Sequence, residues 1–497
     1  MSATRRRFGL VLAAGVLATT PARPQSARHP RVTEAIFLIE TWLDAQRAYQ
    51  RIPGLSAAVV RDQELVWSGG FGLADLERKA AATPTTLYSI CSISKLFTSL
   101  GVLQLRDAGK LRLDDPVGKH LPWFNIKRQF QGAPEITIEG LLTHASGLPR
   151  EADYPYWTGP FTFPTREQVI ERLSKQETLY PAESYFQYSN LGLTLAGEVV
   201  AAASGQPYEA YVRSHILDPL GLSDTHPQMP ESERGRRLAT GYGPWKREGE
   251  RRPLPFFQAR GIGPAAGYAS TARDLASFAS WQFKLLGPGR AEGTGGLGGN
   301  GGTGGVEVLS ANTLREMQRV HFVDTDFETT WGLGFAVWRS EGKTFVGHGG
   351  SCPGYRTELL LKPDEKIATV VMANAIDANA GGLAQRVYEM VSPALKAAHD
   401  TTPPKLADPA LARYIGSYDA EWGGERQVLI WEGQLAVLDL PSDNPIRALT
   451  KLRQAGEHSF RRVRPDDSLG EAWTFEMGPD GRPARLWVHG NSSARIR

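Results

Sequence analysis

Strand-forming segments lie near both ends of the first 400 residues of this 497-residue chain, and helix-forming segments lie between them. The early segment, Leu55–Ala74, contains two apolar runs around a short polar turn, and the late ones are Thr344–Gly347, Arg356–Leu361 and Ile367–Met372. Strands from distant parts of one domain share a sheet when the chain between them is inserted to one side. The pattern predicts an α+β domain with an antiparallel sheet, flanking helices and an inserted helical region.

Several segments are expected to be helices around this sheet. Thr33–Gln50 has an apolar side at helical spacing, whereas Ser92–Ala108 is apolar nearly all round, which predicts a buried central helix. Thr271–Leu286 is a further helix. Leu111–Arg260 mixes helices with loops rich in Pro and aromatic residues, and the Gly-rich segment Gly287–Gly305 predicts a flexible surface insertion.

Residues 401–497 are expected to form a separate unit after a main domain over residues 28–400. Thr401–Pro404 is typical of a linker, and Gln427–Leu440 and Trp473–His489 alternate polar and apolar residues around turns. These features predict a small all-β domain that is a barrel or a sandwich.

The N-terminus is typical of an export signal. Arg5, Arg6 and Arg7 precede the uncharged run Gly9–Thr19, and small residues suited to cleavage follow. The arginines before Phe8 resemble a twin-arginine signal, and a general secretory signal is the alternative. Both predict that residues 1–27 are a signal peptide and that the protein is exported, periplasmic or extracellular. A retained anchor is disfavoured because the apolar run is short.

Charge and composition exclude several classes of function. The chain has 56 Lys+Arg and 53 Asp+Glu, a formal charge of +3 that falls to zero when the first 22 residues, with Arg5, Arg6 and Arg7, are removed. A neutral chain is not attracted to nucleic acid or an acidic membrane, and no apolar run reaches the roughly 18 residues of a membrane span. Two Cys and ten scattered His disfavour a metal site. We therefore expect no metal and no cofactor.

Three short motifs carry the predicted chemistry, and the first is Ser92-x-x-Lys95. A hydroxyl and an ammonium one turn apart at the start of a helix share a face. A desolvated Lys lowers the cost of forming an alkoxide on the Ser, or accepts its proton. The spacing recurs at Ser340-x-x-Lys343, but that match is predicted in a hairpin turn, and short motifs of this kind arise by chance.

The second motif is Tyr188-x-Asn190 and the third is His348-x-Gly350. Beside a buried cation the Tyr188 phenol becomes a plausible general base, and Asn190 can hold the Lys and donate to a substrate carbonyl. The glycines of the third motif let a substrate backbone pair with a strand edge, where His348 would add a donor or partial charge near an acid group. Taken alone, these residues are equally consistent with a packed aromatic ring and a glycine-rich turn.

Together and in this order, the motifs resemble the Ser-x-x-Lys, Ser-Asp-Asn and Lys-Thr-Gly signature of penicillin-binding proteins and β-lactamases. The resemblance is to the branch of class C β-lactamases, D-alanyl-D-alanine carboxypeptidases and esterases. Leu141–Pro149, Gly267–Thr271 and Val371–Asn374 look similar too, so it covers residues 33–395. It implies a β-lactamase-like domain with a five-stranded antiparallel sheet and, for the C-terminal unit, the lipocalin-like β domain appended to some members.

The resemblance implies a serine hydrolase that forms an acyl-enzyme on Ser92 and cleaves an ester or amide of a small molecule or peptide. Lys95 and Tyr188 share the general-base role, and the choice between them stays open. The backbone N–H groups of Ser92 and Ser351 form the oxyanion hole. The substrate-binding residues are Asn190, His348, Gly350 and Ser351. Members that recognise penicillin usually carry Lys in place of His348, so this departure favours esterase or peptidase activity over efficient β-lactam hydrolysis.

The two cysteines flank the same predicted cleft. Cys91 directly precedes Ser92, and Cys352 follows the third motif by two residues. Some carbapenem-hydrolysing β-lactamases of another class place a disulfide at matching positions. That resemblance implies a Cys91–Cys352 disulfide, which an oxidising periplasm permits. Two buried free thiols are the alternative.

Other interpretations stay open at this point. The third motif also resembles the oxyanion motif of α/β-hydrolases, although the chain has no Gly-x-Ser-x-Gly elbow. A penicillin- or cell-wall-peptide-binding protein with little or no turnover would keep the same motifs. The C-terminal domain could reach over the cleft, and the sequence does not define the oligomeric state.

Aromatic residues are frequent in two segments that could form the wall of the cleft. If they line it, they favour a substrate with a bulky acyl group, and otherwise they are packing residues. They are Trp123, Phe124, Tyr154, Tyr156, Trp157, Trp245, Phe256 and Phe257.

Overall fold

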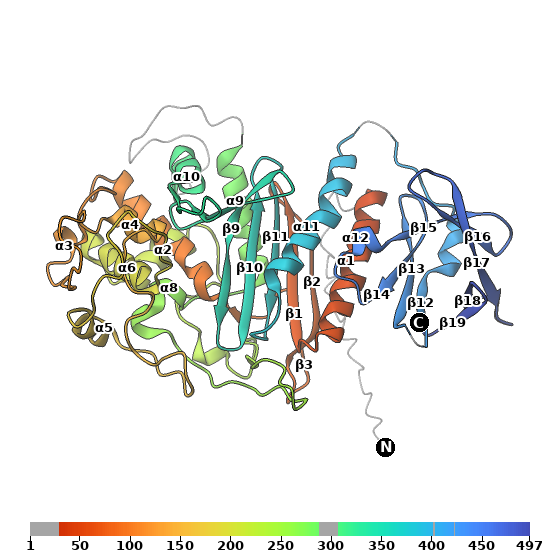
Figure 1. The fold of residues 1–497 in the computed structure, drawn as a ribbon, viewed down its shortest axis with the longest axis horizontal. Helices are drawn as coiled ribbons and strands as arrows, with labels where there is room; N and C mark the ends of the chain where they lie inside the picture. Colours follow the sequence, from red (N-terminus) through yellow and green to blue (C-terminus); the bar gives the residue numbers. More distant parts are fainter. Residues whose placement is uncertain (1–28, 288–306, 401–402, 422) are drawn as a thin grey trace, which may run out of the picture.

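The computed structural model describes residues 29–287, 307–400, 403–421 and 423–497. The predicted signal peptide, the Gly-rich segment after Gly287 and the first two linker residues lie outside the described residues. Within these ranges the chain forms a mixed helix-and-sheet domain followed by a β-barrel (Figure 1). None of the described helices is both long enough and apolar enough to cross a membrane.

The main sheet is antiparallel throughout and combines strands from the two ends of the first 400 residues. Ala58 of the early hairpin pairs with Ser68 on one side and with Val370 of the late group on the other. The described sheet has nine strands rather than five, because segments too short to show a sequence period extend its edges. In spatial order the strands are β3 (Ala80–Ala81), β2 (Glu64–Asp75), β1 (Gly54–Arg61), β11 (Ile367–Ala373), β10 (Tyr355–Lys362), β9 (Lys343–Cys352), β8 (Ala336–Ser340), β7 (Thr330–Trp331) and β6 (Phe322–Val323).

Helices cover both faces of this sheet (Figure 1). One face packs against α1 (Pro30–Tyr49) and α11 (Ala380–Ala397), and the other against α9 (Ala272–Leu286) and the inserted helical region. A strand covered on both faces reads as a continuous apolar run, and every residue of β11 is buried.

The inserted region consists of short helices around two longer ones, α2 and α6. A two-stranded ribbon, β4 (Tyr88–Ser89) with β5 (Ala269–Ser270), joins its ends. The remaining helices are α2 (Ser94–Asp107), α3 (Val117–His120), α4 (Ile138–Thr143), α5 (Arg166–Leu173), α6 (Asn190–Ser204), α7 (Tyr208–Val212), α8 (Gly263–Ala266), α10 (Ala311–Gln318) and α12 (Pro445–Ala448).

The predicted helix from Ser92 begins two residues later than expected. Cys91–Ile93 forms a 3₁₀ turn, and α2 starts at Ser94. Side chains three residues apart eclipse in a 3₁₀ turn, so Ser92 and Lys95 still share a face. The helix is buried nearly all round, as its composition predicts.

The C-terminal unit is a closed barrel of antiparallel strands, and Tyr418 of the first strand pairs with Arg495 of the last. Closure leaves no exposed sheet edge. Aromatic and aliphatic side chains such as Tyr418, Phe460 and Phe475 fill its interior. The strands are β12 (Gly416–Asp419), β13 (Glu425–Trp431), β14 (Gln434–Leu440), β15 (Thr450–Gln454), β16 (Ser459–Val463), β17 (Leu469–Met477), β18 (Pro483–Val488) and β19 (Asn491–Arg495).

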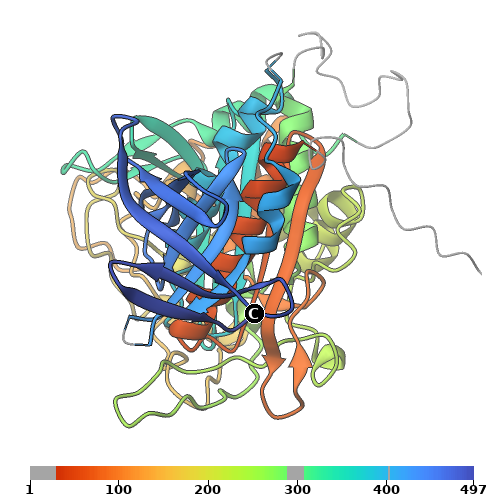
Figure 2. The same ribbon diagram turned by 90° about the vertical axis from the view of Figure 1, so that its right-hand side faces the viewer.

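The barrel docks on α1 and α11, beyond the sheet from the inserted helical region (Figures 1 and 2). The outer faces of β13 and β14 add Trp431 and Leu438 to the apolar cluster that contains α1 and α11. Polar contacts frame this cluster: Trp42 Nε1 donates to the Ser442 carbonyl at 2.7 Å, and Glu34 accepts from the Glu432 amide at 2.8 Å.

Candidate active site

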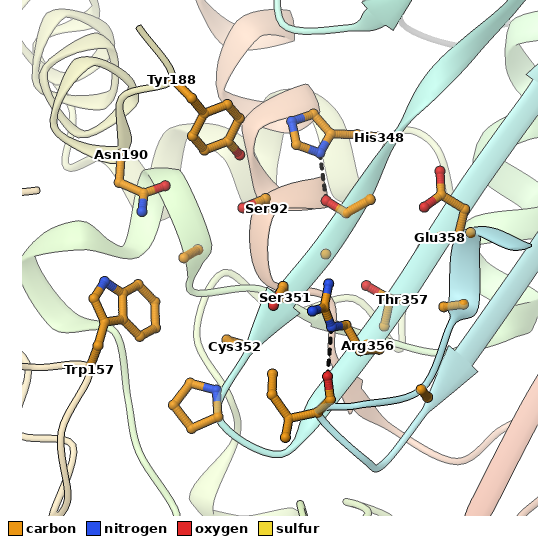
Figure 3. Close-up of a pocket in the computed structure, with 18 of the residues that line it drawn as sticks. Ser92, Trp157, Tyr188, Asn190, His348, Ser351, Cys352, Arg356, Thr357 and Glu358 are labelled. Carbon is orange, nitrogen blue, oxygen red and sulfur yellow. Dashed lines mark hydrogen bonds between the residues drawn. The ribbon is translucent and has the colours of Figure 1, made fainter. Parts of the chain in front are cut away.

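The three predicted motifs meet at one cleft of about 800 Å³ (Figure 3). Ser92 comes from the 3₁₀ turn before α2, and His348 from the last part of β9. Tyr188 and Asn190 lie at the start of α6, where the Ser189 hydroxyl caps the helix by accepting from the Gly192 amide. Residues that are distant in sequence therefore converge where three elements end.

Lys95 lies fully buried beneath Ser92. Its Nζ lies 3.1 Å from Ser92 Oγ, and it donates to Asn190 Oδ1 at 2.8 Å and to the Ala265 carbonyl at 2.8 Å. Burial holds the pKa of Lys95 well below its ordinary value, while the Glu151 carboxylate opposes this shift and raises it. A desolvated amine of this kind can accept the Ser92 proton near neutral pH.

Tyr188 lines the cleft beside Ser92 (Figure 3). Burial raises the pKa of the Tyr188 phenol, and its hydrogen bond with Ser92 offsets only part of that shift. Lys95 Nζ lies 4.9 Å from the centre of the Tyr188 ring, over its face. The raised pKa of the phenol and the lowered pKa of Lys95 favour Lys95 as the proton acceptor, and this assignment stays a prediction.

Glu151 is a functional residue that sequence reasoning missed. Both of its carboxylate oxygens accept from Asn190 Nδ2, at 2.9 and 3.0 Å, and Tyr156 donates its hydroxyl to the same group. This fixes the Asn190 amide so that Oδ1 faces Lys95. No short spacing links Glu151 to Asn190, and the only available signal was an acid two residues after Leu141–Pro149, a segment that already resembled the family.

His348 lines the cleft and is buried. Burial, with a smaller effect of the Lys95 charge, lowers the pKa of His348 to about 3, so the ring is neutral. Its Nδ1 lies 2.6 Å from the Gly349 carbonyl oxygen and must carry the proton, which leaves Nε2, buried and without a partner in the described chain, as an acceptor. The neutral ring disfavours a positive charge for a substrate acid group, and the substrate-binding role of His348 stays a prediction.

The end of β9 offers a free edge to the cleft. In the described residues β8 pairs with β9 only as far as Gly347, so the main chain from His348 to Cys352 has no strand on that side. Gly350 packs so closely that a Cβ there would lie 2.3 Å from the Ile90 carbonyl oxygen. Ser351 lines the cleft as well, and the oxyanion hole formed by the Ser92 and Ser351 amides stays a prediction.

The structure joins Cys91 and Cys352 by a disulfide, with 5.7 Å between their Cα atoms. The bond ties the turn that carries Ser92 to the end of β9. Cys91 also has a positive φ of 50°, which is uncommon for a residue with a side chain. The disulfide thus restrains the backbone directly before Ser92.

Other segments that the sequence suggested for the cleft contribute little to its lining. Of the candidate aromatic residues only Trp157 lines the cleft, whereas Tyr156 and Phe257 are buried in the core. Among the described lining residues none lies beyond Gly381. The barrel therefore does not line the cleft, although the sequence had left open that it could reach over it. The second Ser-x-x-Lys match occupies the turn between β8 and β9. No cluster of three His, Cys, Asp or Glu suited to a metal ion occurs in the described ranges.

A sheet with helices on both faces, an inserted helical region and a Ser–Lys pair at the junction define a protein of the β-lactamase and penicillin-binding type, a class that generally consists of serine hydrolases. A family model for beta-lactamase matches residues 39–389, and the chain belongs to this family.

The relatives in sequence match only in part. The chain is 29% identical over 316 residues to Beta-lactamase-like protein 2 of Dictyostelium discoideum, which covers 62% of this chain and 54% of that protein. It is 34% identical over 190 residues to Protein flp of Staphylococcus aureus (strain MW2), covering 38% of this chain and 37% of that protein. The chain thus spans about half or less of the length of these relatives.

Solved structures share the fold at lower identity. The octameric penicillin-binding protein homologue from Pyrococcus abyssi superposes with a TM-score of 0.61 at 24% identity, over 93% of this chain and 100% of that one. A D-stereospecific amidohydrolase from Streptomyces sp. gives a TM-score of 0.56 at 23% identity, over 70% and 97%. A beta-lactamase/D-alanine carboxypeptidase from Pseudomonas syringae gives 0.57 at 19%, over 74% and 99%.

Proposed function

We propose that the protein is an exported serine hydrolase that forms an acyl-enzyme on Ser92 and hydrolyses an amide or ester. The observation that carries this proposal is the contact of 3.1 Å between Ser92 Oγ and Lys95 Nζ, an amine whose pKa burial has lowered. Export is proposed from the sequence of residues 1–27 alone.

In the first half of the reaction, Ser92 Oγ attacks the substrate carbonyl carbon while its proton passes to Lys95 Nζ. The developing oxyanion accepts hydrogen bonds from the amides of Ser92 and Ser351, each donor contributing about 3 kcal/mol. The C–N or C–O bond then breaks, and the leaving group takes the proton from Lys95 by way of the neutral Tyr188 hydroxyl. Water repeats the sequence on the acyl-enzyme, releasing the acid and restoring Ser92.

The substrate class is narrowed by the neutral state of His348. A β-lactam carboxylate gains no fixed positive charge from this ring, which disfavours efficient β-lactam hydrolysis. Two of the structural neighbours are titled a D-stereospecific amidohydrolase and a D-alanine carboxypeptidase. We therefore place peptides and amides with D-residues first, and simple esters second.

Intact-mass spectrometry with a fluorophosphonate probe and, separately, a penicillin probe tests the proposal. We expect one phosphonate label per chain that is lost in Ser92→Ala, with slow or no penicillin labelling. Rapid labelling by penicillin would instead place the protein among the family members that recognise penicillin. If neither probe reacts with the folded protein, the hydrolase proposal is wrong, and a binding protein with little turnover replaces it.

A further inference from the structure

The described lining of the cleft includes two acidic side chains, Glu151 and Glu358. Glu151 is fully engaged by Asn190 and by an ion pair with Arg150 at 3.2 Å. Glu358 is different, because within the described chain it has no hydrogen-bond or ion-pair partner. The catalytic steps proposed above give it no role either.

Glu358 extends from β10 across Gly349 of β9 on the α11 face of the sheet, and it lines the cleft beside the end of β9. It pairs in register with Gly349 of β9, and a Cβ at Gly349 would lie only 2.8 Å from Glu358 Oε2. On the other side, a Cβ at Gly381 in the first turn of α11 would lie 3.3 Å from the same oxygen. Two glycines therefore leave room for this carboxyl group, and both line the same cleft. Figure 3 shows Glu358 across β9 from Ser92.

No cation of the described protein compensates this acid. Arg356 lies two residues away on the same face of β10, but its Nε donates to the Ile376 carbonyl at 2.7 Å. Asp377, just beyond, is paired with Arg251 at 2.5 Å. The positions that face Glu358 from β9, β11 and α11 are Gly349, Val371 and Gly381, none of which titrates.

A carboxylate withdrawn from water is stable only with a positive partner or several donors. Burial alone raises the pKa of Glu358 to about 8, as expected for an acid without such a partner. A cationic group that enters the cleft would therefore stabilise the ionised form of Glu358. An ammonium group matches this need, since it is compact, carries three donors and fits between two glycine backbones.

We propose that Glu358 binds an ammonium group of the substrate, so that the preferred substrates of this cleft carry a free amine. This inference rests on the proposed hydrolase function, because it assigns a substrate class to the same site. The amine contact lies across β9 from Ser92, and it selects the substrate without touching the reacting atoms.

The contact has a defined pH dependence. Binding needs the ionised carboxyl, whose share rises as the pH passes through the Glu358 pKa of about 8. An alkylammonium ion stays protonated up to a pH of about 10. Its affinity is expected to rise roughly 30-fold between pH 6.5 and pH 9, because each pH unit below the Glu358 pKa weakens binding about tenfold.

The experiment uses n-butylammonium chloride and a matched pair of substrates, D-alanine p-nitroanilide and its N-acetyl derivative. Calorimetry measures butylammonium binding at pH 6.5 and pH 9 to the wild type, to Glu358→Gln and to Arg356→Gln. We expect Glu358→Gln to lose at least tenfold in affinity at pH 9 and all pH dependence, and Arg356→Gln to retain both. For the free-amine substrate KM should rise at least tenfold in Glu358→Gln, and for the N-acetyl substrate it should stay within twofold.

Separate measurements distinguish an error in this inference from an error in the proposed hydrolase function. Phosphonate labelling of Ser92 tests the hydrolase, and an unchanged labelling rate in Glu358→Gln shows that the variant is folded. Butylammonium binding is measured without turnover, so it decides the role of Glu358 even if neither anilide is cleaved. Equal binding to the wild type and Glu358→Gln at pH 9 would overturn the inference.

Discussion

The cleft and the C-terminal barrel use polar residues in opposite ways. Around Ser92, ionisable groups are buried or left without partners: Lys95 is fully buried, and the partly buried Glu358 has no partner in the described chain. In the barrel the interior is aromatic and aliphatic, and the ion pairs lie at the surface, such as Arg453 with Asp467 at 2.6 Å. Buried charge destabilises a fold, so it is retained where it supplies chemistry.

The two regions also differ in what holds them in place. The cleft is assembled from three segments and is tied by a disulfide across β9 and the turn before α2. The barrel is closed by its own strands and contacts the rest of the molecule through α1 and α11. Changes at the cleft should therefore alter activity strongly, and changes at the barrel contact should alter mainly stability.

The largest expected effect is the loss of the nucleophile. Ser92→Ala should lower kcat/KM at least ~1000-fold, because the acyl-enzyme can no longer form. The matched control is Ser340→Ala, which removes the Ser of the second Ser-x-x-Lys match in the β8–β9 turn and should change kcat/KM less than twofold. Equal losses in the two variants would contradict the assignment.

The disulfide should contribute the largest share of stability from a single bond. Replacing Cys91 and Cys352 by Ala together should lower the free energy of unfolding by about 2–5 kcal/mol, because the bond closes a loop of 261 residues. Thermal unfolding followed by circular dichroism measures the difference. Thiol titration of denatured, unreduced wild type is the control, and two free thiols per chain would show that the bond is absent.

Glu151→Gln should lower kcat/KM by about 10- to 100-fold through misplacement of Asn190 and Lys95. A Gln side chain has one acceptor oxygen instead of two, so it cannot keep both contacts from Asn190 Nδ2, at 2.9 and 3.0 Å, and its N–H₂ group faces a donor. Glu151 also raises the pKa of Lys95, so its neutralisation lowers that pKa.

The pH profile separates this positioning role from a purely structural one. If neutral Lys95 is the base, activity rises with pH through its pKa, and the acid limb of the kcat/KM profile should move to lower pH in Glu151→Gln. The control is Glu177→Gln, which removes an exposed acid paired with Lys127 at 3.0 Å and should leave the profile in place. An unmoved acid limb in Glu151→Gln would argue against Lys95 as the base.

The smallest effect is expected at the barrel contact. Arg31 bridges Glu34 at 3.1 Å and Glu432 at 3.0 Å, and it lies over the Trp431 ring. Arg31→Ala should lower the free energy of unfolding by about 1 kcal/mol, measured by urea titration, and leave kcat/KM unchanged. A change in substrate profile would contradict the separation of the barrel from the cleft, since it would show that the two regions are coupled.

Most of the longer helices and strands, and the type of chemistry expected, could be predicted from the sequence. Alternation and length define the β1–β2 hairpin and the buried α2, because these signals depend on neighbours along the chain. The order of three motifs indicated the family, and the sequence also placed the two cysteines beside the same cleft. Strands of two residues, such as β3 and β7, carry no such signal and were not predicted.

The contacts and the pKa shifts in the site depend on the tertiary structure. Folding brings Glu151 to Asn190 and leaves Glu358 without a partner, and burial rather than residue type lowers the pKa of Lys95 and keeps His348 neutral. It also puts the barrel on α1 and α11 instead of over the cleft. These features depend on desolvation and on contacts between distant segments, which the order of residues along the chain does not express.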